Sequence, residues 1–270
     1  MRLNLDLSSA HAKVARAREH LESFEREFAA LPDERKPYAF TIGQINEDGW
    51  VSIFVTANPV LNHRFGTIAS DAVHNLRCAL DYIVTELVEK SPRAKLCKAH
   101  QFPIYDDRDR YTKEVGDEKT ARPKGCLRGV VHGLKNVWAV QPFHGNADAS
   151  GHPLFIVNRF SNADKHRIIT QPRAVPGKVE VVVPEHDGRV IDMRPGDDEP
   201  VEGAKNKFET MRIRFARPFP TYIRYNPSVG VVLEIATPEF DGQPLKVIEL
   251  YILERCSDYV AKTLEFFEKL

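Results

Sequence analysis

The hydrophobic pattern of this chain changes from a helical period to a strand period at about residue 178, and this change limits the folds that are open to it. Apart from one hairpin-like stretch, apolar residues before about residue 170 recur at helical spacing. From about residue 178 they alternate with polar residues, which is typical of strands with one buried face. Helices and strands that are segregated along the chain predict an α+β fold rather than a series of βαβ units.

Helical segments predict a bundle of about four to five helices, packed with an antiparallel sheet and closed by a C-terminal helix. The segments are residues 8–31, 62–90, 125–139, 154–168 and the end of the chain within 244–270. In the first segment, apolar residues from Val14 to Leu31 recur at alternating spacings of four and three, which indicates packing on another helix. We expect that helix to belong to the same chain; the alternative is a second copy, as in a homodimer.

The strand signals fall in two places. Residues 38–59 predict a β-hairpin around the turn sequence NEDG. Further strands are predicted within residues 178–193, 208–216, 221–226 and 231–238, and residues 102–124 are expected to be irregular.

The hairpin decides the predicted domain organisation. If it joins the later strands in one sheet, residues 1–270 form a single α+β domain. The alternative is a division near residue 175, into a mainly helical part with the hairpin (1–175) and a part with strands and the C-terminal helix (176–270).

Charge and cysteine content argue against several classes of protein. Lys and Arg number 38 and Asp and Glu number 38, so the chain lacks the net positive charge that drives non-specific binding to nucleic acid or anionic membranes. A local basic patch stays compatible with this balance. No stretch resembles a signal peptide or a transmembrane helix, and the four cysteines form no CxxC pair. We therefore expect a cytoplasmic protein with no membrane attachment.

Three polar residues lie along one edge of the predicted helix 62–90. His74, Arg77 and Asp81 fall within about 60° of one another beside its apolar face. An aspartate raises the basicity of a nearby histidine and an arginine holds an anion, so this edge has the parts for acid–base chemistry on a phosphate. The alternative is a structural hydrogen-bonded network where the helix meets other elements.

A second polar set interrupts the predicted helix 154–168, where Asn158, Asn162 and His166 share one face at four-residue spacing. If this helix packs on helix 62–90, the two sets form one site, in which a histidine exchanges the proton and cations stabilise negative charge. The alternative is capping near the helix C-terminus. The predicted catalytic residues are His74, Arg77, Asp81, Lys165 and His166, and the predicted ligand-binding residues are Asn158, Asn162, Asp164 and Arg167.

The segment 119–135 contains several cations and no acidic residue. Arg122, Lys124 and Arg128 are its predicted phosphate contacts. The alternative is that they balance the acidic residues just before them. Cys126 lies among these cations, a setting that lowers the pKa of a thiol.

Four residues of the two polar sets are of types that bind metal ions. His74, Asp81, Asp164 and His166 have the nitrogen and oxygen ligands of a divalent-metal hydrolase, which is one alternative. The chain has no HExxH or HxH motif, so no metal site is predicted. Walker A, GxGxxG and GxSxG motifs are also missing, so we predict no cofactor.

Four motifs together resemble a widespread family of uncharacterised bacterial proteins. They are HNLRxALD, here HNLRCALD, followed by FPI, QP[FY]H and NxDKHR, and the resemblance covers residues 66–170. It implies a bacterial protein and carries no established activity.

The central helix is also similar to the RxxxxH motif of HEPN domains. Many of those are metal-independent ribonucleases whose Arg and His act across a dimer of helical bundles. Arg77 matches the arginine, and Tyr82 stands where the histidine would be. A phenol, with a pKa near 10, is a poor acid–base group at neutral pH.

These patterns predict a cytoplasmic bacterial protein that binds an anionic, phosphate-bearing ligand at a His/Arg/Asp site between two helices. The alternatives are a metal-independent HEPN-like ribonuclease, with RNA as its partner, and a divalent-metal hydrolase.

Overall fold

The computed structural model describes most of the chain. Its described residues are 3–32, 35–57, 61–92, 94–117, 119–120, 122–145, 149–165, 170–182, 189–196, 200–204, 206–220, 223–235 and 248–270. Within these, only the backbone is described at residues 57, 164–165, 170–182, 224–235 and 248–249.

The chain divides into two compact units, each built from segments that are distant in the sequence. Unit 1 comprises Met1–Phe28, His63–Thr170 and Glu234–Leu270, and unit 2 comprises Ala29–Asn62 and Gln171–Leu233. A single domain over residues 1–270 stays a prediction.

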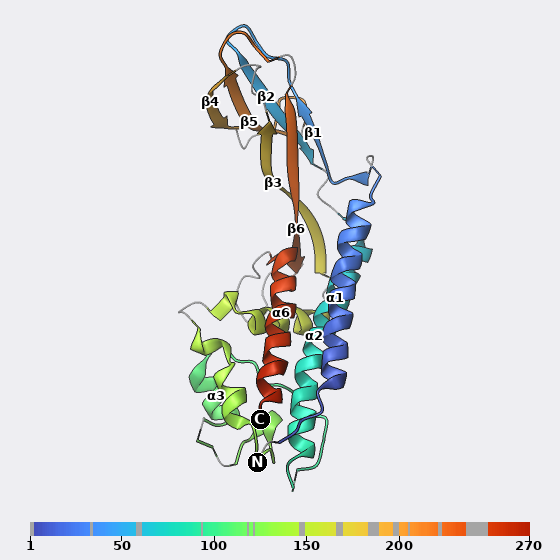
Figure 1. The fold of residues 1–270 in the computed structure, drawn as a ribbon, viewed down its shortest axis with the longest axis vertical. Helices are drawn as coiled ribbons and strands as arrows, with labels where there is room; N and C mark the ends of the chain where they lie inside the picture. The colour runs from blue at the N-terminus through green and yellow to red at the C-terminus, as the bar shows by residue number, and fades with distance from the viewer. Residues whose placement is uncertain are drawn as a thin grey trace. The chain divides into compact units, whose positions relative to one another are not determined.

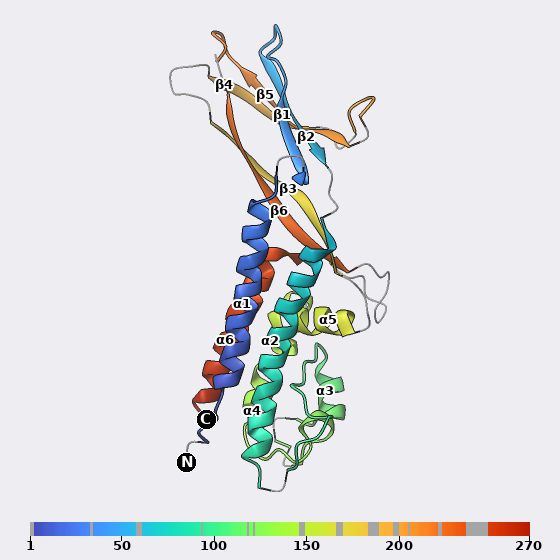
Figure 2. The ribbon, with the colours of Figure 1, turned by 90° about the vertical axis from the view of Figure 1, so that its right-hand side faces the viewer.

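The described α-helices lie in unit 1, apart from the last residue of α1, and the α+β prediction with a closing C-terminal helix is confirmed. Figures 1 and 2 show α1, α2 and α6 side by side, and α5 packs on both α2 and α6. The described α-helices are α1 (Ser8–Ala29), α2 (His63–Glu89), α3 (Arg108–Glu114), α4 (Leu134–Ala139), α5 (Pro153–Lys165) and α6 (Leu250–Glu268). Short 3₁₀ helices span Gly125–Leu127, Pro142–His144 and Ala149–Gly151, and the short strand β7 spans Ile248–Glu249.

The regularly spaced apolar side chains of α1 pack on helices of the same chain, as predicted. Ala10, Val14, Ala17, Leu21 and Phe24 are its buried residues. The Phe24 ring lies 4.9 Å from the Phe65 ring of α2 in an edge-to-face arrangement. On the other side, Arg18 donates to Asp258 of α6 at 2.9 Å.

Unit 2 is a β structure in which the predicted hairpin joins later strands. Its antiparallel sheet has the order β1-β2-β5-β4, so the hairpin strand β2 pairs directly with β5. The strands are β1 (Tyr38–Ile42), β2 (Trp50–Ala57), β4 (Val190–Pro195) and β5 (Lys207–Phe215). In a second sheet β3 (Thr170–Val182) neighbours β6 (Arg224–Ile235).

Two residues of the NEDG sequence, Asn46 and Gly49, stabilise the turn of the β1–β2 hairpin. Asn46 Oδ1 accepts the backbone N–H groups of Asp48 and Trp50 at 3.1 and 2.8 Å. Gly49 has φ +84°, and a Cβ there would lie 2.4 Å from the Phe215 carbonyl oxygen. Only glycine fits this position without displacing β5.

Four sequence expectations about elements were wrong. The predicted helix 125–139 is instead the 3₁₀ helix Gly125–Leu127 and the separate helix α4, with no helix over residues 128–133. Residues 102–124 are not wholly irregular, because α3 forms there with Asp107 as its N-cap, accepting the Arg110 N–H at 2.6 Å. Its seven mostly charged residues give no apolar period to detect. Residues 224–226 and 231–235 of the predicted strands 221–226 and 231–238 belong to the single strand β6, and the predicted strand 178–193 falls on two separate strands, β3 and β4.

Among the described residues, no helix combines the length and the apolar character needed to span a membrane.

Replacing Leu80 tests which side of α2 is buried in unit 1. Leu80 is fully buried, so Leu80→Ala should lower the free energy of unfolding by about 2–5 kcal/mol, measured by urea unfolding followed by circular dichroism. Tyr82→Ala, on the same helix but 38% exposed, should cost no more than about 1 kcal/mol. Equal losses for the two variants would contradict the orientation of α2.

Candidate functional site

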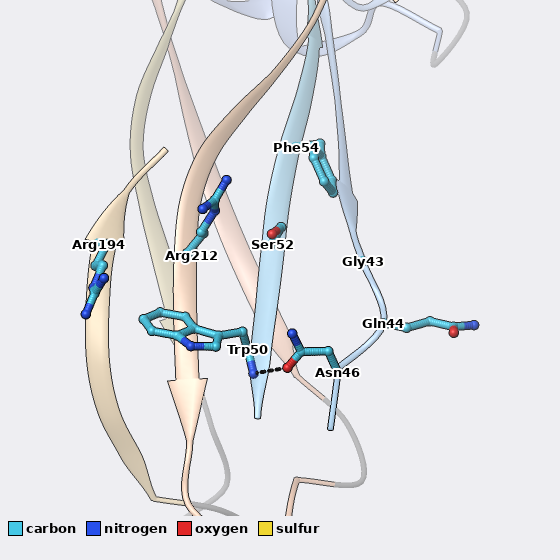
Figure 3. A pocket seen from close by; sticks show the side chains of 8 residues that line it. All are labelled: Gly43, Gln44, Asn46, Trp50, Ser52, Phe54, Arg194 and Arg212. Atoms are coloured by element: carbon cyan, nitrogen blue, oxygen red, sulfur yellow. Dashed lines mark hydrogen bonds between the residues drawn. The ribbon is translucent and has the colours of Figure 1, made fainter. Parts of the chain in front are cut away.

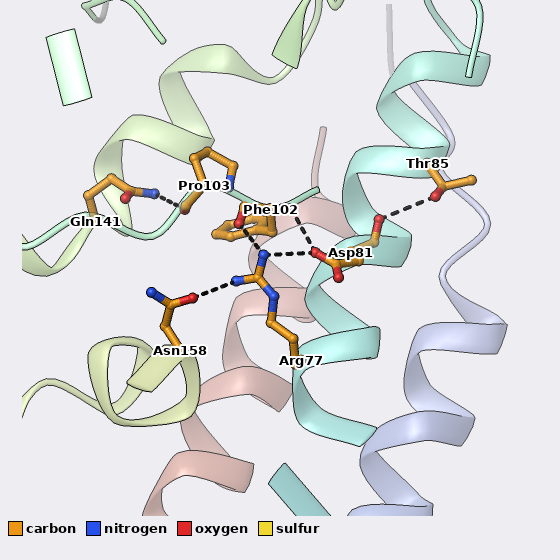
Figure 4. A network of polar contacts seen from close by, with 7 residues as sticks. All are labelled: Arg77, Asp81, Thr85, Phe102, Pro103, Gln141 and Asn158. Carbon is orange, nitrogen blue, oxygen red and sulfur yellow. Dashed lines mark hydrogen bonds and ion pairs between the residues drawn. The ribbon is translucent and has the colours of Figure 1, made fainter. Parts of the chain in front are cut away.

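Arg77 and Asp81, both on α2, hold the backbone of Phe102. Arg77 is only 4% exposed. Its Nη2 donates to the Phe102 carbonyl oxygen at 2.8 Å and lies 3.2 Å from Asp81 Oδ1. The same Asp81 oxygen accepts the Phe102 N–H at 2.8 Å. One arginine–aspartate pair therefore satisfies both backbone polar groups of Phe102 (Figure 4).

The side chain of Gln141 forms hydrogen bonds with the backbone of the next residues, Pro103 and Tyr105. Its buried side chain donates from Nε2 to the carbonyl oxygens of Pro103 and Val137, both at 2.9 Å. Its Oε1 accepts the Tyr105 N–H at 3.1 Å. Residues 101–105 have no regular secondary structure, so side chains replace the partners that a neighbouring strand would supply.

The hydrogen bonds to the Phe102 backbone hold the Phe102 ring in the core of unit 1. Phe102 is fully buried and its ring lies 6.1 Å from that of Phe267 in α6. The structural network that the sequence allowed as an alternative thus accounts for the contacts of Arg77 and Asp81. Because Gln141 belongs to QP[FY]H and Phe102 to FPI, the network connects three of the four sequence motifs.

A cleft of about 630 Å³ lies beside this network, between α2, α5 and residues 101–106. Its size is within the range of small-molecule sites, roughly 300–1,000 Å³. Phe102, Pro103, Ile104 and Phe155 form its apolar part. Its other lining residues are Arg77, Gln101, Tyr105, Asp106, Arg110, Cys126, Asn158, Arg159 and Asn162.

Three arginines and one carboxylate line the cleft. They are Arg77, Arg110, Arg159 and Asp106. Beside the lining, the carboxylates of Asp81 and Glu114 pair with Arg77 and Arg110. Arg77 Nη1 donates to Asn158 Oδ1 at 3.4 Å, which is longer than the usual range of about 2.7–3.2 Å. The cleft can therefore receive a negatively charged group without displacing a short bond of this nitrogen to Asn158.

Glu114 and Tyr105 position Arg110 at the cleft. Arg110 Nε lies 3.2 Å from one Glu114 oxygen, and the Tyr105 hydroxyl donates to the other at 2.7 Å. The Tyr105 hydroxyl and the Arg110 guanidinium hold the pKa of the Glu114 carboxyl below its usual value. Burial, together with this bond to Glu114, raises the pKa of the Tyr105 phenol, so that phenol is neutral.

The prediction of a lowered thiol pKa at Cys126 was wrong. Burial raises the pKa of this thiol to about 11, and this effect is larger than the attraction of the nearby Arg77 charge. The thiol is therefore protonated at neutral pH and is a poor nucleophile.

The packing of α5 on α2 brings three predicted residues together at the cleft and leaves others elsewhere. Arg77, Asn158 and Asn162 line it. His74 is exposed, and its Nε2 lies 3.5 Å from Cys78 Sγ. The exposed Arg122, Lys124 and Arg128 are also not among the lining residues. His166 and Arg167, and the side chains of Asp164 and Lys165, lie outside the described residues.

Three residues of this region were missed by the sequence interpretation. Arg159 lies three residues before Asn162, a spacing that shares a helix face, so it could have been included. Gln141 lay in a noted motif, but its partners are backbone atoms that no spacing rule identifies. Arg110 is on α3, which was not predicted.

No group of three or more His, Cys, Asp or Glu side chains in the described part of the chain is arranged to hold a metal ion. The predicted ligand set includes Asp164 and His166, whose side chains are not described. The metal-hydrolase alternative therefore stays a prediction.

Comparison of the chain with models of protein families, with curated proteins and with solved structures gave no match. The resemblances to the bacterial family and to HEPN domains stay predictions.

Removing the Asp81 carboxylate should destabilise unit 1. Asp81→Ala leaves the buried Arg77 without its counterion and the Phe102 N–H without its acceptor. Because the carboxylate is partly exposed, we expect a loss of about 1–3 kcal/mol in the free energy of unfolding. His74→Ala, an exposed change on the same helix, is the control and should have little effect. An unchanged free energy of unfolding in Asp81→Ala would contradict the structural role of Asp81.

The contribution of Glu114 to stability should depend on pH. Its pKa is lower in the folded protein, so its stabilising effect is complete above its ordinary pKa of 4.5 and is lost as pH falls through the folded value. The stability difference between wild type and Glu114→Gln, measured by thermal unfolding, should be largest at neutral pH and vanish in acid. A difference that is independent of pH would rule out an electrostatic contribution.

Proposed function

We propose that unit 1 binds a phosphate-bearing small molecule in the cleft lined by Arg77. The observation that carries this proposal is the lining itself, in which three arginines and two asparagines are accompanied by one aspartate. Arginine is charged at every physiological pH and its planar group matches phosphate oxygens with two parallel hydrogen bonds.

Each part of the cleft has a role in this binding. The buried Arg77 is fixed by its contacts with Asp81 and Phe102, so it loses little freedom when a ligand binds. The amides of Asn158 and Asn162 add donors for phosphate or sugar oxygens. The ring of Phe155 offers an apolar surface for the remainder of the ligand.

Binding explains the described lining better than catalysis does. Among the described lining residues there is no histidine, and the thiol and phenol present are both protonated at neutral pH. Acid–base catalysis would need a group such as His166, which lies outside the described residues. Because His166 is not described, the ribonuclease alternative, with RNA as its partner, stays a prediction.

We also propose a cytoplasmic location, which the four free cysteines support. A bacterial source and a homodimer stay predictions, because no described contact bears on them.

Calorimetric titration tests the cleft directly. The protein should bind inorganic phosphate, and a nucleoside monophosphate more tightly, because the latter adds apolar contact. Arg159→Gln and Arg110→Gln should each weaken binding by about tenfold to one hundredfold, since a hydrogen bond to a charged group contributes roughly 1.5–3 kcal/mol.

Arg16→Gln is the matched control, because Arg16 is an exposed arginine of the same unit that pairs with Glu19 on α1. It should bind like the wild type. No binding of either probe, or an equal loss in Arg16→Gln, would overturn the proposal.

A further inference from the structure

The four-stranded sheet of unit 2 has two unlike faces. One face is the core of the unit, where Val51, Ile53, Ile213 and Phe215 are buried. On the other face the register puts Trp50, Ser52 and Phe54 of β2 opposite Arg214, Arg212 and Glu209 of β5. This second face, which we call the Trp50 face, is not used by the cleft of unit 1.

Aromatic rings and cations are paired on the Trp50 face. The Trp50 ring lies 5.0 Å from the Arg194 guanidinium carbon and 5.8 Å from that of Arg214. Since Arg194 is on β4, the indole extends across β5 to reach it (Figure 3). Further along β2, the Phe54 ring lies 4.6 Å from Lys207 Nζ. Both rings are partly exposed.

A hollow of about 540 Å³ lies on this face. It is lined mainly by Trp50, Phe54, Arg194 and Arg212, with Gln44 and Asn46 at its edge. Rings, guanidinium groups and amides thus meet at one exposed surface, and each matches a different part of a nucleotide.

The charge of the face is positive. The register and the adjoining strand β4 place four cations on it, Arg194, Lys207, Arg212 and Arg214, and two carboxylates, Asp192 and Glu209. Glu209 lies 2.6 Å from Arg212, and Asp192 lies 2.8 Å from Arg194. These contacts orient two of the guanidinium groups and leave two positive charges in excess.

We infer that the Trp50 face binds single-stranded nucleic acid. Bases stack on Trp50 and Phe54, and the arginines contact the phosphates. A duplex is not the expected ligand, because its bases are stacked on one another and their faces are not available to a sheet surface. The chain as a whole has no net charge, so its total charge does not favour non-specific binding to nucleic acid.

Fluorescence anisotropy with the full chain tests this inference, using a labelled oligouridylate, an oligothymidylate and a DNA duplex at low salt. The protein should bind either single strand more tightly than the duplex. Trp50→Leu should weaken binding about tenfold or more, and Trp50→Phe, which keeps a ring, should retain most of it. Arg194→Gln together with Arg214→Gln should reduce the salt dependence, by about 0.7 in the logarithmic slope per lost phosphate contact.

Two controls separate this site from other causes of binding. Arg35→Gln, an exposed arginine of unit 2 before β1, should leave affinity unchanged. Arg159→Gln should also leave it unchanged, so failure of the cleft proposal and failure of this one are distinguishable. Absence of binding, equal affinity for duplex, unaltered binding by Trp50→Leu, or an equal loss in Arg35→Gln would each overturn the inference.

Discussion

The buried guanidinium of Arg77 organises the helical unit around it. A charge that is 4% exposed has lost most of its hydration, and such a loss is compensated only by a counterion and by hydrogen bonds of good geometry. Asp81 and the Phe102 carbonyl provide them. Together with Gln141, Arg77 and Asp81 satisfy both backbone groups of Phe102, the Pro103 carbonyl and the Tyr105 N–H, and the Phe102 ring lies in the core.

The two proposed sites use arginine in different settings. In the cleft, Arg77 is immobilised by protein contacts before any ligand arrives, which favours recognition of a small anion. On the Trp50 face, the guanidinium groups lie beside partly exposed rings on one face of a sheet, which favours an extended ligand with bases and phosphates in alternation. Each proposal rests on contacts within one unit, so each can fail without the other.

Local patterns predicted much of the fold. The spacing of Val14 to Phe24 gave the buried side of α1, and the NEDG turn with its flanking β-branched residues gave the hairpin. The short α3 was missed because its seven residues carry no apolar period. At the site, helical spacing correctly associated Arg77 with Asp81 and Asn158 with Asn162. It could not show that Asp81 binds the Phe102 N–H or that Gln141 binds Pro103, because these partners are backbone atoms distant in the sequence.

Arg77 binds the Phe102 backbone and, in our proposal, also forms part of an anion-binding cleft. Hydrogen exchange measured by mass spectrometry, with and without inorganic phosphate, tests this proposal most directly. Peptides covering residues 101–106 and α5 should exchange more slowly when phosphate is added, while those from the sheet of unit 2 should not change. Unchanged exchange in both cleft segments under saturating phosphate would contradict it.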